Sequence, residues 1–247
     1  MSCTRRSGSS SAASPATSRM DRLKSFLRDL RRHSSSSRSG CGAAPRTRAS
    51  TTSNEFKFQV NWTFRGPLIS DKSALVDELR RTIRDVNNFP KPGIVFKDVT
   101  PVLLDARLFA RTVQLMAEPY RDARVTRVVS IESRGFLFGA PIALELGAGL
   151  VPIRKPGKLP AATQRIEYAL EYGTDALEMH HDAVQPGDRV MVVDDVLATG
   201  GTANAAAQLV GGTGAAVVGF SFLIELDFLK GRQRLQGRRV EALLHYA

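Results

Sequence analysis

The sequence predicts an α/β fold in which a parallel sheet is flanked by helices. From Ser73 onward, short runs rich in β-branched residues alternate with stretches whose apolar residues repeat at helical spacing. Such alternation is typical of parallel sheets, because the crossover between two parallel strands is usually made by a helix. Polar motifs follow directly after several of the expected strands. Because ligands bind at the carboxyl ends of strands in such sheets, these motifs predict a functional site.

The expected elements follow one another in a regular order. The first helix begins near Ser73 and is ended by the Asn and Pro residues at 87–90. Its apolar positions are Leu75, Leu79, Ile83 and Val86. The next elements are a helix over 106–120, a strand over 128–131, a helix over 136–146, a strand over 150–153, a long loop over 158–179, a strand over 190–193, a helix over 202–210 and a strand over 215–226.

Residues 1–54 differ from the rest of the chain in composition. Ser, Arg, Ala, Thr and Gly dominate this segment, which holds eleven of the 35 Lys and Arg residues but two of the 24 acidic residues. Most of the net charge of +11 therefore belongs to this segment and not to a basic face of the folded part. A segment so poor in apolar residues cannot offset its conformational entropy by burial, so we expect a disordered extension. Residues 55–70 are expected to form a linker, and residues 71–247 the folded domain.

The extension is compatible with three roles: an organellar transit peptide, a segment that binds nucleic acid or an acidic membrane surface, and a dispensable addition. Both cysteines, Cys3 and Cys41, lie in it, as suits a reducing compartment. No apolar run approaches the ~18 residues of a membrane helix, and no secretory signal is recognisable. We therefore expect a cytoplasmic protein that does not contact a membrane and whose folded domain does not bind nucleic acid.

The most informative motif lies at residues 190–202 and reads VMVVDDVLATGGT. An expected strand ends in Asp194 and Asp195, and a helix follows after Ala198, Thr199, Gly200, Gly201 and Thr202. Glycines let backbone N–H groups approach an anion, and a helix N-terminus adds unpaired donors, so this loop predicts a phosphate site. The threonine hydroxyls can add donors and cap the helix. Carboxylates repel phosphate but suit sugar hydroxyls, hydrated Mg²⁺ or a developing positive charge, so the motif indicates a sugar phosphate.

The motif resembles the phosphoribosyl-diphosphate motif of the type I phosphoribosyltransferases. Four further segments narrow the resemblance to those that act on adenine: FPKPGIVFKDVTPVLLD at 89–105, ESRGFLFGAPIALELG at 132–147, RKPGKLP at 154–160 and LEYGTDALEMH at 170–180. Together they span most of residues 73–246. The resemblance implies the type I phosphoribosyltransferase fold, with a small hood that carries base contacts and a flexible lid loop over the site. It also implies a homodimer.

The resemblance assigns roles to residues that hold the sugar and phosphates. Arg134 would hold the diphosphate with its fork of donors. Lys155 and Lys158 would take the leaving diphosphate, whose charge grows as its bond to the sugar breaks. The loop at 198–202 would hold the 5′-phosphate. Glu171 in the lid would exchange a proton at the imidazole edge of the purine as a general acid or base.

Other residues are assigned to the base and to the ribose. Phe96 would stack on adenine, while backbone groups of Val95 and Lys97 would bind its edge. Val196 would cover the opposite face of the base, where the family often has a larger leucine. Asp194 and Asp195 would orient the ribose hydroxyls and stabilise a transition state that resembles an oxocarbenium ion.

The implied reaction converts adenine and 5-phosphoribosyl 1-diphosphate into AMP and diphosphate. Mg²⁺ is expected as the cofactor, bound to the diphosphate and held by the protein through water to Asp194 or Asp195 rather than by direct ligation. Two alternatives remain. The first is a phosphoribosyltransferase for another purine base, and the second is a non-catalytic regulator that kept the fold to sense a sugar phosphate.

Overall fold

The computed structural model describes residues 72–169 and 174–247. The expected extension and linker, and residues 170–173 of the lid loop expected at 158–179, lie outside the described residues. Among those described, no helix has the length and apolar character needed to cross a membrane.

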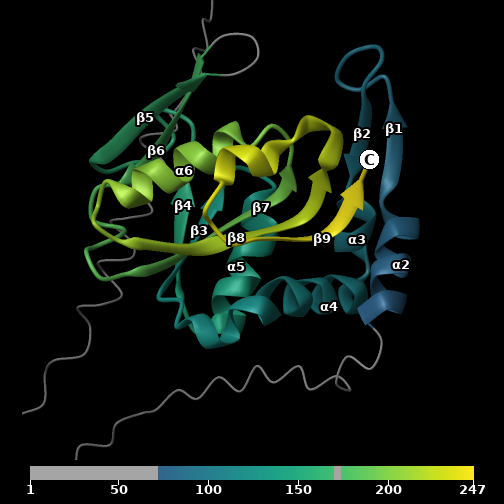
Figure 1. Cartoon of the computed structure of the whole chain (residues 1–247), viewed down its shortest axis with the longest axis horizontal. Helices are drawn as coiled ribbons and strands as arrows, with labels where there is room; N and C mark the ends of the chain where they lie inside the picture. The colour runs from purple at the N-terminus through teal and green to yellow at the C-terminus, as the bar shows by residue number, and fades with distance from the viewer. Residues whose placement is uncertain (1–71, 170–173) are drawn as a thin grey trace, which may run out of the picture. The chain divides into compact units, whose positions relative to one another are not determined.

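Five strands of the described residues form one sheet (Figure 1). They are β3 (Arg127–Ile131), β4 (Gly149–Ile153), β7 (Arg189–Leu197), β8 (Ala216–Leu226) and β9 (Val240–Tyr246). Their order is β4-β3-β7-β8-β9, and each strand runs parallel to its neighbours. The predicted parallel sheet is thus confirmed, with β7 at its centre.

The central strands are buried on both faces, which explains their unbroken apolar sequences. Along β7, Val190 and Val192 pack into the core on one face of the sheet, and Met191 and Val193 into the core on the other. A strand covered on one face only would alternate apolar with polar residues. The run of apolar residues therefore requires helices on both faces.

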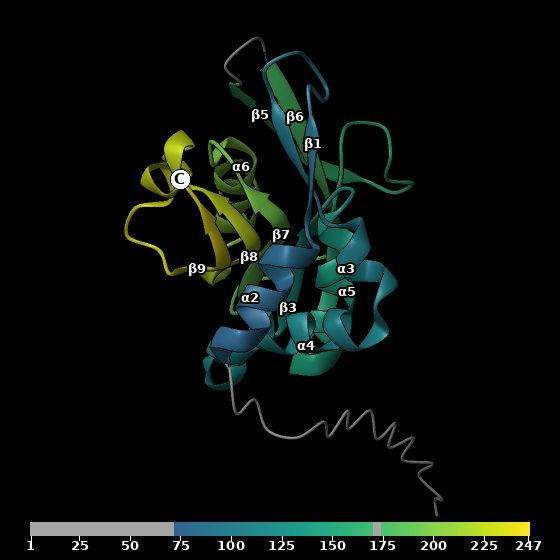
Figure 2. The same ribbon diagram turned by 90° about the vertical axis from the view of Figure 1, so that its right-hand side faces the viewer.

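Helices cover the sheet from both sides (Figure 1 and Figure 2). On one side α2 (Lys72–Thr82), α4 (Ala106–Ala117) and α5 (Gly135–Leu146) share a core with the sheet. On the other side α6 (Gly201–Gly211) packs through small side chains, its buried alanines. The short helix α3 (Thr100–Leu104) precedes α4, and the 3₁₀ helix η1 (Glu118–Ala123) follows it. Two further 3₁₀ helices, η2 (Asp227–Leu229) and η3 (Gly231–Leu235), connect β8 to β9.

Two antiparallel hairpins lie beyond the carboxyl ends of the sheet strands (Figure 2). One pairs β1 (Arg84–Asn87) with β2 (Val95–Asp98). The other pairs β5 (Thr163–Ala169) with β6 (Thr174–His180). The first corresponds to the expected hood, and the second occupies the place of the expected lid loop.

Two expectations about individual elements are wrong, and one strand was not expected. The helix expected to include Val86 ends at Thr82, and Val86 lies in β1 opposite Phe96. Its spacing from Ile83 fits a helix, but strand pairing decides its conformation. The long loop expected at 158–179 is mostly the β5–β6 hairpin, in which Ile166 and Tyr168 pack against the core. Strand β9 has no counterpart among the expected elements.

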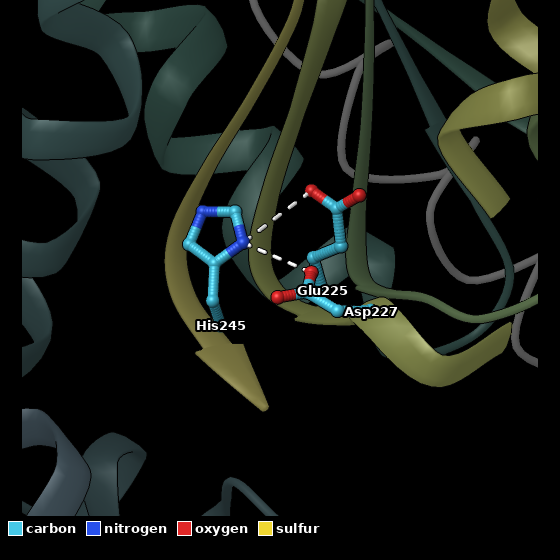
Figure 3. A group of neighbouring side chains, drawn as sticks. All are labelled: Glu225, Asp227 and His245. Carbon is cyan, nitrogen blue, oxygen red and sulfur yellow. Dashed lines mark hydrogen bonds and ion pairs between the residues drawn. The ribbon is translucent and has the colours of Figure 1, made fainter. Parts of the chain in front are cut away.

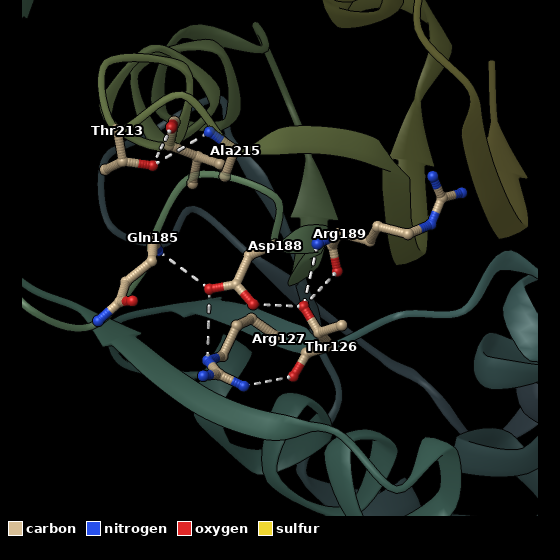
Figure 4. A network of polar contacts seen from close by, with 8 residues as sticks. Thr126, Arg127, Gln185, Asp188, Arg189, Thr213 and Ala215 are labelled. Carbon is tan, nitrogen blue, oxygen red and sulfur yellow. Dashed lines mark hydrogen bonds and ion pairs between the residues drawn. The ribbon is translucent and has the colours of Figure 1, made fainter.

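A polar network joins the amino-terminal ends of β3 and β7, at the opposite end of β7 from the acid pair (Figure 4). The Asp188 carboxylate accepts hydrogen bonds from the Thr126 hydroxyl at 2.7 Å and from the Gln185 backbone N–H at 2.9 Å. The Nε of Arg127 lies 3.7 Å from it, and the Arg189 N–H donates to the Thr126 hydroxyl. Burial by itself raises the pKa of Asp188, but these donors outweigh burial and lower it. The network stabilises the strands without reaching the site.

Gly139 sets how closely α5 packs on β3. A β-carbon at this position would lie 2.6 Å from the β-carbon of Ser130, which is buried in β3. Gly139→Ala should therefore lower the free energy of unfolding by about 1–3 kcal/mol, the usual cost of overpacking a core. Urea denaturation measures this change.

Gly211→Ala is the matched control, because Gly211 is helical and nothing lies within 4 Å of an added β-carbon. It should leave the free energy of unfolding unchanged or raise it by up to about 1 kcal/mol, since alanine favours a helix. Equal losses in the two variants would show that helix packing at Gly139 is not the cause.

Candidate active site

A cavity of about 420 Å³ lies at the carboxyl edge of the sheet. Strand β2, the segments after β3 and β4, both strands of the β5–β6 hairpin and the ends of β7 and β8 contribute to its wall. Its volume falls within the range of small-molecule sites. The arrangement follows from the topology, because the carboxyl ends of parallel strands meet at one edge.

The cavity brings together most of the residues predicted to form the site. Those predicted to contact the base all line it: Val95, Phe96, Lys97 and Val196. Of those predicted to contact the sugar and phosphates, Arg134, Lys155, Asp194, Asp195, Ala198 and Thr202 line it.

The remaining predicted residues are placed differently. Thr199, Gly200 and Gly201 do not line the cavity themselves but connect Ala198 to Thr202, which do. The exposed Lys158 is also absent from the wall, and its carbonyl oxygen accepts a hydrogen bond from Nη1 of Arg154 at 3.2 Å. Glu171 lies outside the described residues.

Several residues of the wall escaped the sequence analysis, among them Ile94, Asp175, Leu177 and Leu226. Leu226 is the last residue of β8, so its position at a strand end could have indicated it. Asp175 and Leu177 belong to β6, and no sequence signal distinguished that strand from a loop.

The acid pair stands at the end of the central strand. Asp195 is 3% exposed, and the backbone N–H of Asp195 donates to Oδ1 of Asp194 at 2.9 Å. Burial, and then the negative charge of Asp195, raise the pKa of Asp194 well above its usual value. Burial also raises the pKa of Asp195, although Arg134 partly offsets the effect. The pair is therefore a concentrated negative charge that a cation in the cavity would relieve.

Arg134 connects the acid pair to the base surface. Its Nε lies 2.9 Å from Oδ2 of Asp195, and its guanidinium carbon lies 4.8 Å from the ring centroid of Phe96. The edge of Phe89 meets the Phe96 ring with centroids 5.1 Å apart. The Phe96 ring is thus held by a cation on its face and by an aromatic neighbour.

Lys97 turns its side chain toward the protein rather than toward a ligand. Its Nζ lies 2.7 Å from Oδ1 of Asp85 and 4.1 Å from the ring centroid of Tyr246. Because Asp85 is the cross-strand partner of Lys97, these contacts fix the β1–β2 hairpin against the end of β9. The backbone of Lys97 remains as the group that can bind a base.

On the phosphate side, a lysine and an aspartate pair across the cavity. Nζ of Lys155 lies 2.9 Å from Oδ2 of Asp175. This hydrogen bond raises the pKa of Lys155 and lowers that of Asp175, so both are charged at neutral pH. The Tyr168 hydroxyl lies 3.4 Å from Asp175 and 3.4 Å from the Thr202 hydroxyl. Tyr168 thus joins the hairpin to the phosphate loop.

The phosphate loop ends at a helix that begins on glycine. The N-cap of α6 is Gly200, with φ +76° in the left-handed region and no side-chain cap. The expectation that a threonine caps this helix is therefore wrong. The Thr202 hydroxyl faces the cavity and Tyr168 instead. A glycine at the cap leaves the N–H groups of the first helical turn without a side-chain acceptor, so they are available to an anion.

The neighbouring helix α5 begins equally close to the acid pair. A β-carbon at Gly135 would lie 2.8 Å from Oδ1 of Asp194 and 3.1 Å from the carbonyl oxygen of Val193. Only glycine allows this approach. The residue before it, Arg134, is thereby fixed beside the carboxylates.

Comparison with known proteins agrees with this geometry. The phosphoribosyl transferase domain family matches residues 103–238. Because that match covers more than half of the chain, the protein belongs to the phosphoribosyltransferase family.

Individual relatives show to which group of phosphoribosyltransferases the chain belongs. The adenine phosphoribosyltransferase of Myxococcus xanthus is 58% identical over 180 residues, 73% of this chain and 97% of that protein. The structure of adenine phosphoribosyltransferase from Thermoanaerobacter pseudethanolicus is 50% identical, with a TM-score of 0.68 over 69% of this chain and 99% of that one. The Saccharomyces cerevisiae enzyme, complexed with an imino-altritol bisphosphate and adenine, is 40% identical, with a TM-score of 0.65 over 69% and 99%. The chain is a member of the adenine phosphoribosyltransferases.

The raised pKa of Asp194 predicts a cost in stability. The folded protein holds the Asp194 proton to higher pH than the unfolded chain does, so stability falls as the pH rises above about 4. Asp194→Asn removes the charge and keeps an oxygen that accepts the Asp195 N–H. The free energy of unfolding at pH 7 should rise by about 0.5–2 kcal/mol, and the gain should vanish below about pH 4. Denaturant unfolding over this pH range measures both.

Asp175→Asn is the control, in which the free energy of unfolding at pH 7 should change in the opposite direction. The pKa of Asp175 is lowered by Lys155, so its charge stabilises the fold above about pH 4 and the variant should lose stability at pH 7. A loss of stability at pH 7 in both variants would mean that the charge of Asp194 does not destabilise the folded protein.

Proposed function

We propose that the protein transfers the phosphoribosyl group of 5-phosphoribosyl 1-diphosphate to adenine, giving AMP and diphosphate, and so salvages adenine. One observation carries the proposal. A single cavity combines an aromatic surface at Phe96, the acid pair Asp194 and Asp195, and both ends of the phosphate loop, Ala198 and Thr202. Membership of the adenine phosphoribosyltransferases and the adenine complex of the yeast relative support the same substrate.

The base would bind between Phe96 and Val196. Phe96 supplies a planar apolar surface, and its position is fixed by Phe89 and Arg134. Backbone groups of Val95 and Lys97 would bind the edge of adenine. The ion pair of Lys97 with Asp85 keeps this stretch of backbone in place.

In the reaction, the bond between C1′ of the ribose and the diphosphate oxygen breaks, and N9 of adenine bonds to C1′. Positive charge develops on the sugar ring as the first bond breaks. Asp194 and Asp195 would stabilise that charge and orient the ribose hydroxyls, because their burial leaves them short of counter-charge. The proton of adenine leaves as N9 bonds, and Glu171 would accept it.

The departing diphosphate needs cations. Lys155 lines the cavity and is kept charged by Asp175, and Arg134 lies beside the acid pair. Lys158 is exposed on the same segment as Lys155. All three would bind the diphosphate, and the loop at 198–202 would hold the 5′-phosphate through its N–H groups.

Mg²⁺ is the cofactor that we propose, and the residues present fit it. Hard oxygen ligands suit this ion, and two buried carboxylates stand here beside one cation, Arg134, whose Nε lies 2.9 Å from Oδ2 of Asp195. Asp194 and Asp195 would hold the ion through water. When bound, the ion would neutralise part of the charge on the diphosphate.

We also propose a cytoplasmic homodimer. Leu137 and Leu144 are exposed seven residues apart, on one face of α5. A second copy that packs on this face would bury these side chains. Sedimentation equilibrium should therefore give twice the chain mass of 26.9 kDa, and Leu144→Glu should give the mass of one chain.

The substrate is tested by incubating the full chain with phosphoribosyl diphosphate, Mg²⁺ and one purine base at a time. Adenine should yield AMP, while hypoxanthine, guanine and xanthine should react at least about 100-fold less efficiently, as a polar pocket rejects a mismatched edge. Turnover of another base without turnover of adenine would support the first alternative. Binding without turnover of any base would support the regulator.

The same assay tests the proton acceptor. Glu171→Ala should lower kcat by about 100-fold or more, the usual share of a general acid or base. Glu167→Ala is the control, since Glu167 lies on β5 and pairs on the exposed surface with Arg165 at 2.7 Å. A rate near that of the unaltered protein in Glu171→Ala would remove Glu171 from the mechanism.

A further inference from the structure

An ion pair between a buried glutamate and a half-exposed arginine lies behind the phosphate loop, outside the cavity. Glu225, near the end of β8, is 4% exposed. Nε of Arg232 donates to its Oε1 at 3.0 Å, and Nη2 of Arg232 donates to its Oε2 at 2.5 Å. Nη1 of Arg232 donates to the carbonyl oxygen of Val240 at 2.7 Å. A two-point contact of this kind fixes orientation as well as distance. The β8–β9 connection, residues 227–239, is therefore tied to the strands on both sides of it.

Gly231, the residue before Arg232, lies directly against the phosphate loop. A β-carbon at Gly231 would overlap the carbonyl oxygen of Ala198 and lie 3.0 Å from the backbone nitrogen of Gly200. Seen from the loop, a β-carbon at Gly200 would overlap the carbonyl oxygen of Gly231 and lie 3.3 Å from its α-carbon. Backbone thus rests on backbone, so the position of Gly231 sets the position of Ala198 and Gly200.

The strand ends add to this contact. Glu225 pairs with Leu197 of β7, the residue before Ala198, and with His245 of β9. Nδ1 of His245 lies 3.1 Å from Oδ1 of Asp227 and 3.8 Å from Oε2 of Glu225 (Figure 3). Two acids and a histidine can bind a metal. Here both oxygens of Glu225 already accept from a guanidinium, so the cluster serves to hold the connection in place.

We propose that Glu225, Arg232 and Gly231 are positioning residues for the 5′-phosphate. The ion pair locks the β8–β9 connection, and Gly231 then supports the phosphate loop in the conformation that presents its N–H groups to the anion. None of the three lines the cavity. The inference deepens the proposed function and rests on it only in taking the ligand of the loop to be a sugar phosphate.

Loss of the ion pair between Glu225 and Arg232 should weaken binding of the 5′-phosphate and leave binding of the base unchanged. Leu226, which does line the cavity, is held independently through strand pairing with Tyr246. The Phe96 surface is held by Arg134 and Phe89. Loosening the connection therefore changes the loop and leaves the base surface in place.

The test compares a phosphate probe with the base. In Glu225→Gln, which keeps the side-chain shape but loses the charge, the Kd of ribose 5-phosphate measured by calorimetry should rise about 10-fold or more. The KM of phosphoribosyl diphosphate should rise with it, while the KM of adenine stays within about twofold. Arg232→Lys, which keeps the charge but loses the fork, should give a smaller rise in the same direction. Gly231→Ala should give a larger one, because the added carbon displaces Ala198.

Glu145→Gln is the matched control. It removes another ion pair, between Arg121 and Glu145 at 2.5 Å, on α5 and away from the loop, and should leave both constants unchanged. Thermal unfolding verifies that each variant is folded at the assay temperature. If Glu225→Gln does not fold, Arg232→Lys decides the question.

Two results would overturn the proposal: an unchanged ribose 5-phosphate affinity in folded variants, or an equal rise in the KM of adenine, which would indicate general damage to the cavity. Failure of the proposed function has a different signature. In that case the unaltered protein would bind ribose 5-phosphate without converting adenine to AMP, and the binding ratio between variants would still decide the role of Glu225 and Arg232.

Discussion

The structure depends on one strand, β7, that is buried on both faces and carries two carboxylates near its carboxyl end. One core of the protein contains Val190 and Val192, and the core on the other face of the sheet contains Met191 and Val193. The helices on either side of the sheet are therefore both required. Asp194 and Asp195 interrupt the apolar run where β7 reaches the cavity, and the strand ends at the buried Leu197. Arg134 and Leu226 lie beside the acids because the parallel neighbours β3 and β8 end at the same edge of the sheet.

The cavity wall is organised by charge. Arg134 lies against Asp195, and Lys155 against Asp175, so two of the cations predicted to bind phosphates are paired with carboxylates. A phosphate ligand would compete with a carboxylate for each cation, and the buried Asp195 would lose part of its counter-charge if Arg134 turned to the ligand. Asp194 forms no ion pair among the described residues, and burial together with the negative charge of Asp195 raises its pKa. This negative charge makes the site suited to a developing positive charge.

Much of the fold could be predicted from the sequence, and the exceptions have a common cause. Four of the five strands of the sheet were predictable, and in the central strand double burial leaves an unbroken apolar run at residues 190–193. Val86 was misassigned because its spacing from Ile83 satisfies helical periodicity, while the pairing with Phe96 that decides its conformation lies ten residues away. The β5–β6 hairpin was hidden because polar residues interrupt both strands, among them Glu178, which is buried in β6. The N-terminus of α6 was also not predictable from the sequence. Gly200 caps the helix through its backbone conformation, and no threonine hydroxyl does so.

For the site, the sequence by itself determined which chemical groups are available: the acid pair, the glycines of the loop, Arg134, Lys155 and Phe96. Each of these groups belongs to a short local motif within a strand or close to its end. Tertiary structure alone decided which of them meet, and which do not. It turned the Lys97 side chain toward Asp85 and Tyr246, and it brought Asp175 to Lys155 from an unrecognised strand. It also set Gly231 against the phosphate loop. The physical reason is that such contacts join residues far apart in the chain, where local periodicity and motif spacing carry no information about distance.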